Sequence, residues 1–262
     1  MYIIAGAISV ALGLLSGKIY IRIIFFAVAA YCFFKLYKRK KEKKSVGSNR
    51  SVQNPSADVK KPEPREVPRY KRITVNAFMA SPPEEYVAFD LETTGLSPQT
   101  DRIIEIGAVY VDHGQIIASF SQLVDPRMSI PAAASEKNNI TDAMVRGCPT
   151  IDRVLPEFRD FIGDAKILAA HNATFDANFL MAAALECGIQ LDVKFFDTLA
   201  LSRAAWPNMK NHKLETLADK IKHPIGQAHR ATYDAEVLPD LIGKAGKAIR
   251  RAEQKRAQEE AE

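Results

Sequence analysis

The first 37 residues form an almost continuous apolar stretch. Among their side chains only Lys18, Arg22 and Lys35 carry a charge. As a helix, residues 19–37 would extend about 28 Å, close to the hydrocarbon core of a bilayer, which is about 30 Å thick. The pattern predicts a membrane anchor over residues 1–37, and it fits either one span or a short hairpin of two.

A basic stretch rich in Pro and Ser follows at residues 38–81. It begins within the sequence KLYKRKKEKK, residues 35–44, which contains seven basic residues and a single acid, Glu42. Under the positive-inside rule this end lies in the cytoplasm, so we expect the protein in the inner (cytoplasmic) membrane with its catalytic part facing the cytoplasm. Ser, Pro and charge predict a flexible or partly polyproline linker. A cleaved signal peptide fits less well, because no positive segment precedes the apolar run.

From residue 82 the pattern is that of a globular domain, which we place at residues 82–248, with a charged helical tail at 249–262. Period-two alternation predicts strands at 85–92, 102–112 and 115–125, with the sequence DHG as a hairpin turn. Helical spacing then alternates with one short apolar strand at 165–170; the helices expected are 150–163, 173–188, 212–221 and 231–254. This order predicts an α/β domain with a mixed central sheet flanked by helices.

Charge is distributed unevenly between these parts. The chain has a net charge of +5, but residues 1–81 contain 16 Lys and Arg against 4 Asp and Glu. Subtracting these from the totals of 36 and 31 leaves 20 against 27, a net charge of −7 for the rest. The domain therefore does not attract polyanions through its overall charge, and a nucleic acid would need bound metal or a local basic patch.

One such patch is predicted on the last helix. Four basic residues follow helical spacing and share one face: Lys244, Lys247, Arg251 and Lys255. This stripe fits an ordinary solvated helix face or a track for the phosphates of a single strand, and the sequence leaves both open.

Two acids, Asp90 and Glu92, interrupt the apolar pattern of the first strand. Side chains two apart on a strand point to the same face, so their charges repel. At about 4 Å and an effective dielectric near 20 the repulsion is on the order of 4 kcal/mol, unless a proton or a cation lies between them. The pair therefore indicates a cation site.

Two later segments, HNATFDANFL and HRATYDAE, each place an acid early in a helix with a histidine upstream. In the first, Asn172 can cap the helix, which puts Asp176 near the carboxyl end of a strand. In the second, five helical steps, about 140° net, separate His229 from Asp234, so the histidine belongs to the preceding loop. Its ordinary pKa near 6.5 suits proton transfer at neutral pH.

Three aspartates and a glutamate at one place require cations, and oxygen ligands favour Mg²⁺ or Mn²⁺ over Zn²⁺. Two divalent ions about 3.5 to 4 Å apart stabilise the attacking and leaving oxygens of phosphodiester cleavage. We therefore predict two divalent cations as cofactors, with His229 taking the proton of the attacking water.

The segments FDLETTGLSP, HNATFDANFL and HRATYDAE resemble, in order and spacing, the three motifs of the DEDDh 3′–5′ exonucleases, a family that includes the proofreading epsilon subunit of bacterial DNA polymerase III. The resemblance covers roughly residues 84–245. It implies a ribonuclease H-like exonuclease fold and hydrolysis of nucleic acids from their 3′ ends. Asn139 departs from the pattern, because relatives usually have Gly before this Ile-Thr pair. The membrane segment and linker are not part of the family pattern.

The resemblance also implies roles for single residues. The metal-binding acids would be Asp90, Glu92, Asp176 and Asp234, and the general base would be His229. The backbone around Thr93 would hold the 3′-terminal nucleotide, and Leu96 and Phe175 would flank its base.

The sequence thus predicts a membrane-tethered 3′–5′ exonuclease whose leading substrate is single-stranded DNA. RNA is the alternative substrate, because DNA-acting and RNA-acting members share these motifs. A third possibility is a catalytically silent domain of the same fold that serves as a membrane-bound nucleic-acid-binding module.

Overall fold

The structure, a computed structural model, describes residues 63–224 and 230–261. The predicted anchor at residues 1–37 and most of the predicted linker lie outside this part of the chain, as does His229. Among the helices of the described residues, none is long and apolar enough to cross a membrane.

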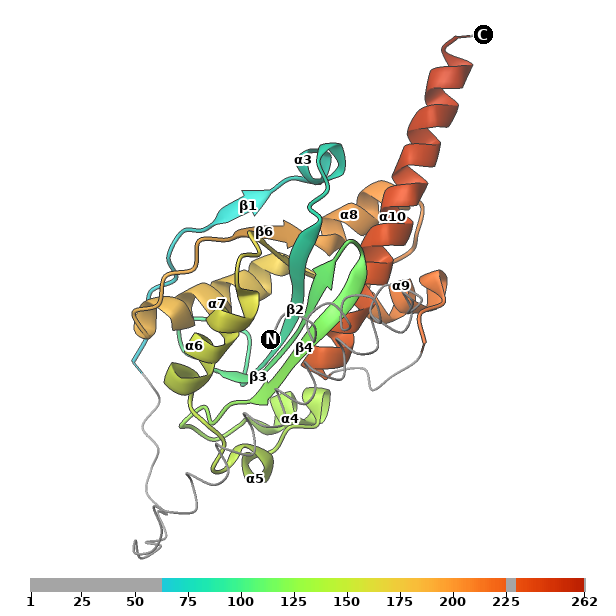
Figure 1. Ribbon diagram of the computed structural model, residues 1–262. Coiled ribbons are helices and arrows are strands. Elements are labelled where there is room, and N and C mark those ends of the chain that lie inside the picture. The colour runs from blue at the N-terminus through green and yellow to red at the C-terminus, as the bar shows by residue number, and fades with distance from the viewer. Residues whose placement is uncertain (1–62, 225–229, 262) are drawn as a thin grey trace, which may run out of the picture. The chain divides into compact units, whose positions relative to one another are not determined.

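In the described residues, six strands form a mixed sheet (Figure 1). They are β1 (Lys71–Ile73), β2 (Glu85–Thr93), β3 (Ile103–Asp112), β4 (Gln115–Leu123), β5 (Ile167–Ala170) and β6 (Lys194–Asp197). The order is β1-β6-β5-β2-β3-β4. β2, β3 and β4 pair antiparallel, whereas the pairs on the other side of β2 are parallel. The predicted mixed sheet is confirmed.

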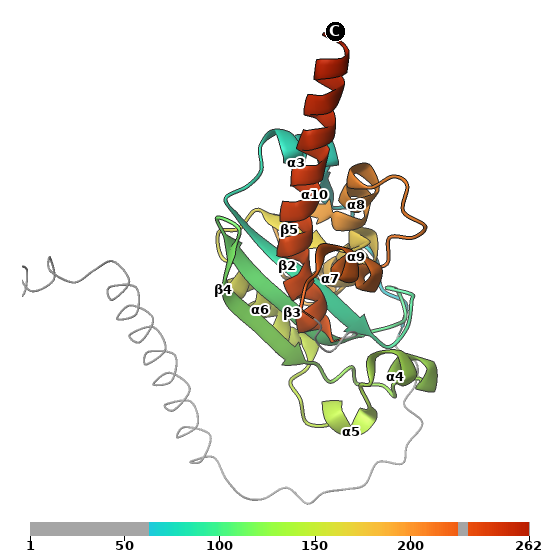
Figure 2. The ribbon, with the colours of Figure 1, turned by 90° about the vertical axis from the view of Figure 1, so that its right-hand side faces the viewer.

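Helices cover both faces of this sheet (Figure 2). The helices are α3 (Val75–Ala80), α4 (Ala132–Asn138), α5 (Asp142–Val145), α6 (Ile151–Ile162), α7 (Ala173–Glu186), α8 (Thr198–Ala205), α9 (Leu214–Ile221) and α10 (Ala231–Glu259). α6 and α7 share one apolar core with the sheet, and α3, α8, α9 and α10 share a second core. The sheet is thus the middle of three layers.

The alternation of β2 determines the layer that each of its side chains joins. Phe89 and Leu91 belong to the core with α6 and α7, whereas Ala88 belongs to the core with α10. Asp90 and Glu92 continue the Ala88 series, so they point toward the α10 side where the strand ends. The two acids thus share one face of the sheet, as predicted, and α10 packs on that face.

Residues 71–80, expected in the linker, instead form β1 and α3. β1 pairs in parallel with β6. Phe78 of α3 is buried and stacks on Phe196, with ring centroids 3.7 Å apart. A strand of three residues is too short to show a period of two, which is why the pattern did not reveal it.

The basic stripe lies on the exposed side of α10, whose C-terminal part extends beyond the sheet in Figure 1. All four of its residues are exposed: Lys244, Lys247, Arg251 and Lys255. The Lys244 ammonium donates to the carbonyl of Ile221, and Lys255 Nζ lies 3.5 Å from Glu259 Oε1. Binding of nucleic acid by this face stays a prediction.

The first turn of α10 lies directly on β3 at Gly107. A Cβ at this position would lie 2.1 Å from the carbonyl carbon of Ala231 and from the backbone nitrogen of Thr232. Gly107 is also the cross-strand partner of Asp90. The bare backbone of β3 therefore sets how closely α10 approaches the acids.

Replacing Gly107 by Ala should lower the free energy of unfolding by about 2 kcal/mol or more, because the clashing atoms are backbone and α10 has to shift. Gly243→Ala is the matched control, since a Cβ there meets nothing within 4 Å and α10 is helical at this point. It should raise the free energy of unfolding by about 0.5–1 kcal/mol. Urea unfolding of both variants is the measurement, and equal stabilities would contradict the close contact.

Candidate active site

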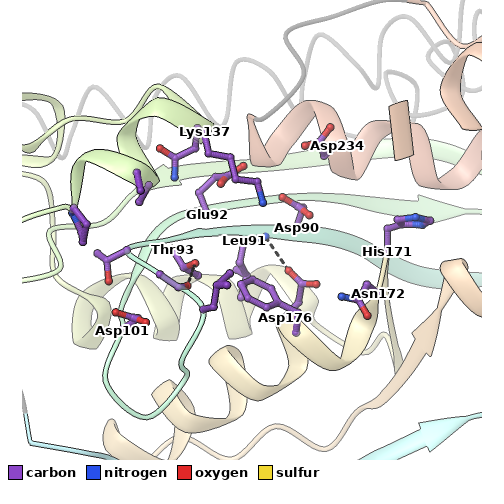
Figure 3. Close-up of a pocket in the computed structure, with 18 residues that line it drawn as sticks. Asp90, Leu91, Glu92, Thr93, Asp101, Lys137, His171, Asn172, Asp176 and Asp234 are labelled. Carbon is purple, nitrogen blue, oxygen red and sulfur yellow. Dashed lines mark hydrogen bonds between the residues drawn. The ribbon is translucent and has the colours of Figure 1, made fainter. Parts of the chain in front are cut away.

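A pocket of about 780 Å³ opens where β2 ends, with lining residues from α4, α7 and the start of α10 (Figure 3). Seven of the eight residues predicted for the site line it: Asp90, Glu92, Thr93, Leu96, Phe175, Asp176 and Asp234. The eighth, His229, lies outside the described residues. Segments far apart in the sequence thus meet at one end of the sheet.

Three of the four acids converge closely. One carboxylate oxygen each of Asp90, Glu92 and Asp234 lies within 4.8 Å of the other two. Asp176 comes from the first turn of α7, and Figure 3 shows it across Asp90 from Asp234. Its Oδ1 accepts a hydrogen bond of 3.2 Å from the backbone nitrogen of Leu91, which holds the side chain against β2.

Burial and mutual repulsion make these carboxylates hard to ionise. Burial, reinforced by the charges of Asp176, Asp234 and Glu92, raises the pKa of Asp90 well above its ordinary value. Burial also raises the pKa of Glu92 to about 7 and that of Asp176 to about 8. Without a cation the cluster would therefore hold protons at neutral pH.

This arrangement fits divalent cations. Carboxylate oxygens are the hard ligands that Mg²⁺ and Mn²⁺ prefer. The raised pKa values mean that keeping these carboxylates ionised side by side costs free energy, and a bound positive charge would offset that cost. Asp90, Glu92 and Asp234 could share one ion, and Asp176 is close enough to Asp90 to add to its repulsion.

Two residues that the sequence did not single out act on Glu92. Asn138, buried at the end of α4, forms a side-chain hydrogen bond with Glu92, and Lys137 brings a positive charge near it; both oppose the rise in the pKa of Glu92.

The next residue, Asn139, ends α4 with a left-handed backbone, φ 58° and ψ 20°. Asn tolerates this conformation nearly as Gly does, which accounts for the departure from the motif.

The start of α7 differs from the prediction in one respect. Asn172 occupies the cap position, but with φ 65° its side chain makes no capping hydrogen bond. Asp197, at the end of β6, takes over this role. Its Oδ1 accepts from the backbone nitrogens of Asn172 and Ala173 at 3.0 and 3.4 Å and also from Leu199 at 2.9 Å, at the start of α8. No local motif could reveal a cap that comes from another strand.

His171, which also lines the pocket, has both ring nitrogens engaged. Nδ1 lies 3.0 Å from Thr198 Oγ1, and Nε2 lies 2.8 Å from the carbonyl oxygen of His212. Burial lowers its pKa. These contacts tie the turn between β5 and α7 to α8 and to the loop before α9, so His171 acts as a structural residue.

The three residues expected to contact substrate form apolar and polar walls. Leu96 is 79% exposed at the pocket. Phe175 is half-buried, and its ring centroid lies 4.9 Å from that of Phe179. Thr93 is buried, and its Oγ1 donates to the carbonyl of Gly95 at 2.7 Å. Their contacts with a nucleotide stay predictions.

The fold is similar to that of two solved exonuclease structures. The chain is 30% identical to Exonuclease X in complex with 5′ overhanging duplex DNA, with a TM-score of 0.50 over 62% of this chain and 92% of that one. E. coli Exonuclease I in complex with a dA16 oligonucleotide has a TM-score of 0.55 over 64% of this chain and 42% of that one, at 17% identity. The likeness confirms the ribonuclease H-like exonuclease fold.

Curated relatives are much longer proteins. The PolC-type DNA polymerase III of Clostridium perfringens is 42% identical over 170 residues, which are 65% of this chain and 12% of the relative. That of Halalkalibacterium halodurans is 43% identical over 159 residues, 60% of this chain and 11% of the relative. The chain thus corresponds to a small part of them. Residues 87–241 match the exonuclease (RNase_T) family, and the chain belongs to that family.

Proposed function

We propose that this chain is a 3′–5′ exonuclease that hydrolyses phosphodiester bonds at the 3′ ends of DNA, with single-stranded DNA as its leading substrate. The observation that carries the proposal is the convergence of Asp90, Glu92, Asp176 and Asp234 in one open pocket with apolar walls. The family is one of metal-dependent nucleases, and a pocket that gathers acids suits a cation-assisted attack on phosphate.

DNA is favoured over RNA by the relatives. The curated relatives are DNA polymerases, and the solved structure of Exonuclease X contains duplex DNA with a 5′ overhang. An exoribonuclease is the alternative substrate class, because neither the acids nor the apolar walls distinguish a 2′-hydroxyl. A silent binding module is the alternative from another class, and the complete set of four acids weighs against it.

In the proposed reaction each part of the pocket has one task. Asp90, Glu92, Asp176 and Asp234 hold two divalent cations, Mg²⁺ or Mn²⁺. When bound, the cations would stabilise the negative charge that develops on the phosphate oxygens. Leu96 and Phe175 flank the terminal base, and the backbone around Thr93 holds the terminal nucleotide. His229 takes the proton from the attacking water.

We further propose that residues 1–37 anchor the protein in the inner membrane, with the catalytic domain in the cytoplasm. The support is the apolar sequence and the basic residues that follow it. We also propose residues 38–81 as the linker, 82–248 as the catalytic domain and 249–262 as the tail. The end of this linker, residues 71–80, forms β1 and α3 and so belongs to the folded part.

Cell fractionation tests the anchor. The full chain should sediment with membranes and resist carbonate extraction, whereas a chain lacking residues 1–37 should be released, because the remaining described helices cannot span a bilayer. Recovery of the full chain in the carbonate supernatant would contradict the proposal.

The nuclease activity is tested with the full chain in detergent on 5′-labelled single-stranded DNA and RNA. Mg²⁺ or Mn²⁺ should support stepwise shortening from the 3′ end, and EDTA should abolish it. Asp90→Ala should lower the rate by more than about 100-fold, since loss of a ligand exceeds the effect usual for an outer-shell partner. Asp160→Ala, exposed on α6 away from the pocket, is the control and should retain the wild-type rate.

The faster polymer in this assay identifies the substrate class. Binding of either polymer without shortening, in both metals, would instead support the silent module. Equal rates for Asp90→Ala and the wild type would remove the proposed site.

The metal-free protein should lose stability as the pH rises from about 4 to about 8. Glu92 and Asp176 have pKa values of about 7 and 8 in the fold, above the ordinary 4.5 and 3.8, so the folded state binds more protons than the unfolded state in this window. The melting temperature in EDTA, followed by the fluorescence of Trp206, should therefore fall across it. Mg²⁺ should raise the melting temperature more at the alkaline end.

Asp176→Asn removes one of the carboxyl groups whose pKa is raised. The melting temperature of this variant without metal should therefore depend less on pH than that of the wild type. Asp160→Asn should keep the wild-type dependence. Identical pH profiles for Asp176→Asn and the wild type would show that Asp176 is ionised throughout, contrary to the expected proton uptake.

A further inference from the structure

Glu105 is a fifth carboxylate close to the acid cluster. It is 1% exposed and is the cross-strand partner of Glu92. Its charge contributes to the raised pKa values of Asp90 and Glu92. Within the described residues, however, the group that could share an ion consists of Asp90, Glu92 and Asp234. A buried carboxylate that holds no cation needs other partners.

Among the described residues, the hydrogen-bond partners of the Glu105 side chain lie at the start of α10. Arg230 Nη2 donates to Oε1 at 2.7 Å, and Arg230 Nε lies 3.2 Å from both carboxylate oxygens. The backbone nitrogen of Ala231 donates to Oε2 at 3.1 Å. The planar guanidinium and the carboxylate thus engage each other at more than one point, which fixes direction as well as distance.

The helix has no cap of its own at this end. Arg230 occupies the cap position and makes no side-chain capping bond, since its guanidinium cannot accept one. Its carbonyl accepts the first helical hydrogen bond, from the backbone nitrogen of Asp234 at 3.1 Å. Glu105 supplies from β3 the acceptor and the negative charge that a helix N-terminus favours.

Gly107 adds a second constraint on the same turn. It lies two residues after Glu105, so both positions face α10 from β3. The backbone of Ala231 and Thr232 fills the space that a side chain at Gly107 would need. Glu105 therefore fixes the orientation of the turn, and Gly107 fixes its distance from the sheet.

We propose that Glu105 is a positioning residue that, paired with Arg230, fixes the first turn of α10 and so places the carboxylate of Asp234 beside Asp90 and Glu92. The inference rests on the proposed nuclease function for its activity measurement. In that function two divalent cations balance the four ligand acids, and Arg230 balances the charge of Glu105.

The test is Glu105→Gln in the full chain, which keeps the shape of the side chain and removes its charge. Mn²⁺ affinity, measured by electron paramagnetic resonance, should fall about 10-fold, because Asp234 is no longer held in place. On 5′-labelled single-stranded DNA, kcat should fall about 10- to 100-fold, the cost of a small misplacement of a reacting group. KM should change less than about twofold, since the pocket walls that contact the strand are untouched.

Glu186→Gln is the matched control. It removes the carboxylate of another arginine pair, with Arg65 at 2.9 Å, outside the acid pocket. Mn²⁺ affinity and kcat should stay at wild-type values in this variant. Arg230→Lys keeps the charge but loses the fork, so it should lower both quantities about 3- to 10-fold. The double variant Glu105→Gln with Arg230→Gln should be no worse than Glu105→Gln alone, because the two side chains act as one unit.

A lower melting temperature of Glu105→Gln with unchanged Mn²⁺ affinity and kcat would overturn the proposal, since that is the result of a purely structural role. If Glu105→Gln does not fold, Arg230→Lys carries the same test, because the Arg230 side chain is 35% exposed and tolerates change more readily. A wild-type protein that binds Mn²⁺ without cleaving DNA would refute the proposed function, and the Mn²⁺ affinities of the variants would still decide the role of Glu105.

Discussion

The mutual repulsion of carboxylates in a half-buried pocket is the constraint on which this structure depends. A single strand position, the end of β2, brings Asp90 and Glu92 together, and two helices add Asp176 and Asp234 from opposite sides. Each acid comes from a regular element and none from a free loop. Side chains that repel one another stay in place only if their backbones cannot move apart, and strand and helix backbones are held by hydrogen bonds along their whole length.

The apolar layers provide the rest of the support. β2 lies between β3 and β5, and its side chains enter separate cores on the two faces of the sheet. Fully buried rings such as Phe89 leave no room for the strand to rotate. Packing on both faces of the sheet therefore holds β2 in place, including its polar end. Burial of the apolar side chains of β2 contributes free energy that offsets the repulsion between the carboxylates at that end.

The sequence was sufficient for residues whose position follows from local geometry. Asp90 and Glu92 share a face because a strand alternates, and Asp176 and Asp234 lie early in helices that a periodic pattern reveals. It was insufficient for Asp197, Asn138 and Glu105, each of which contacts residues 24 to 126 positions away in the chain. β1 and α3 were missed for a related reason, because β1 is short and acquires its partner only when β6 is in place.

Asp197 illustrates what such long-range contacts entail. An ordinary N-cap serves one helix, and its loss costs that helix about 1 kcal/mol. Asp197 serves two, since one oxygen accepts from the chain leading into α7 and from the first turn of α8. The starts of the two helices consequently depend on one carboxylate at the end of β6. A substitution of Asp197 would remove an acceptor from both, including the helix whose first turn carries Asp176, although Asp197 is not one of the acids of the pocket.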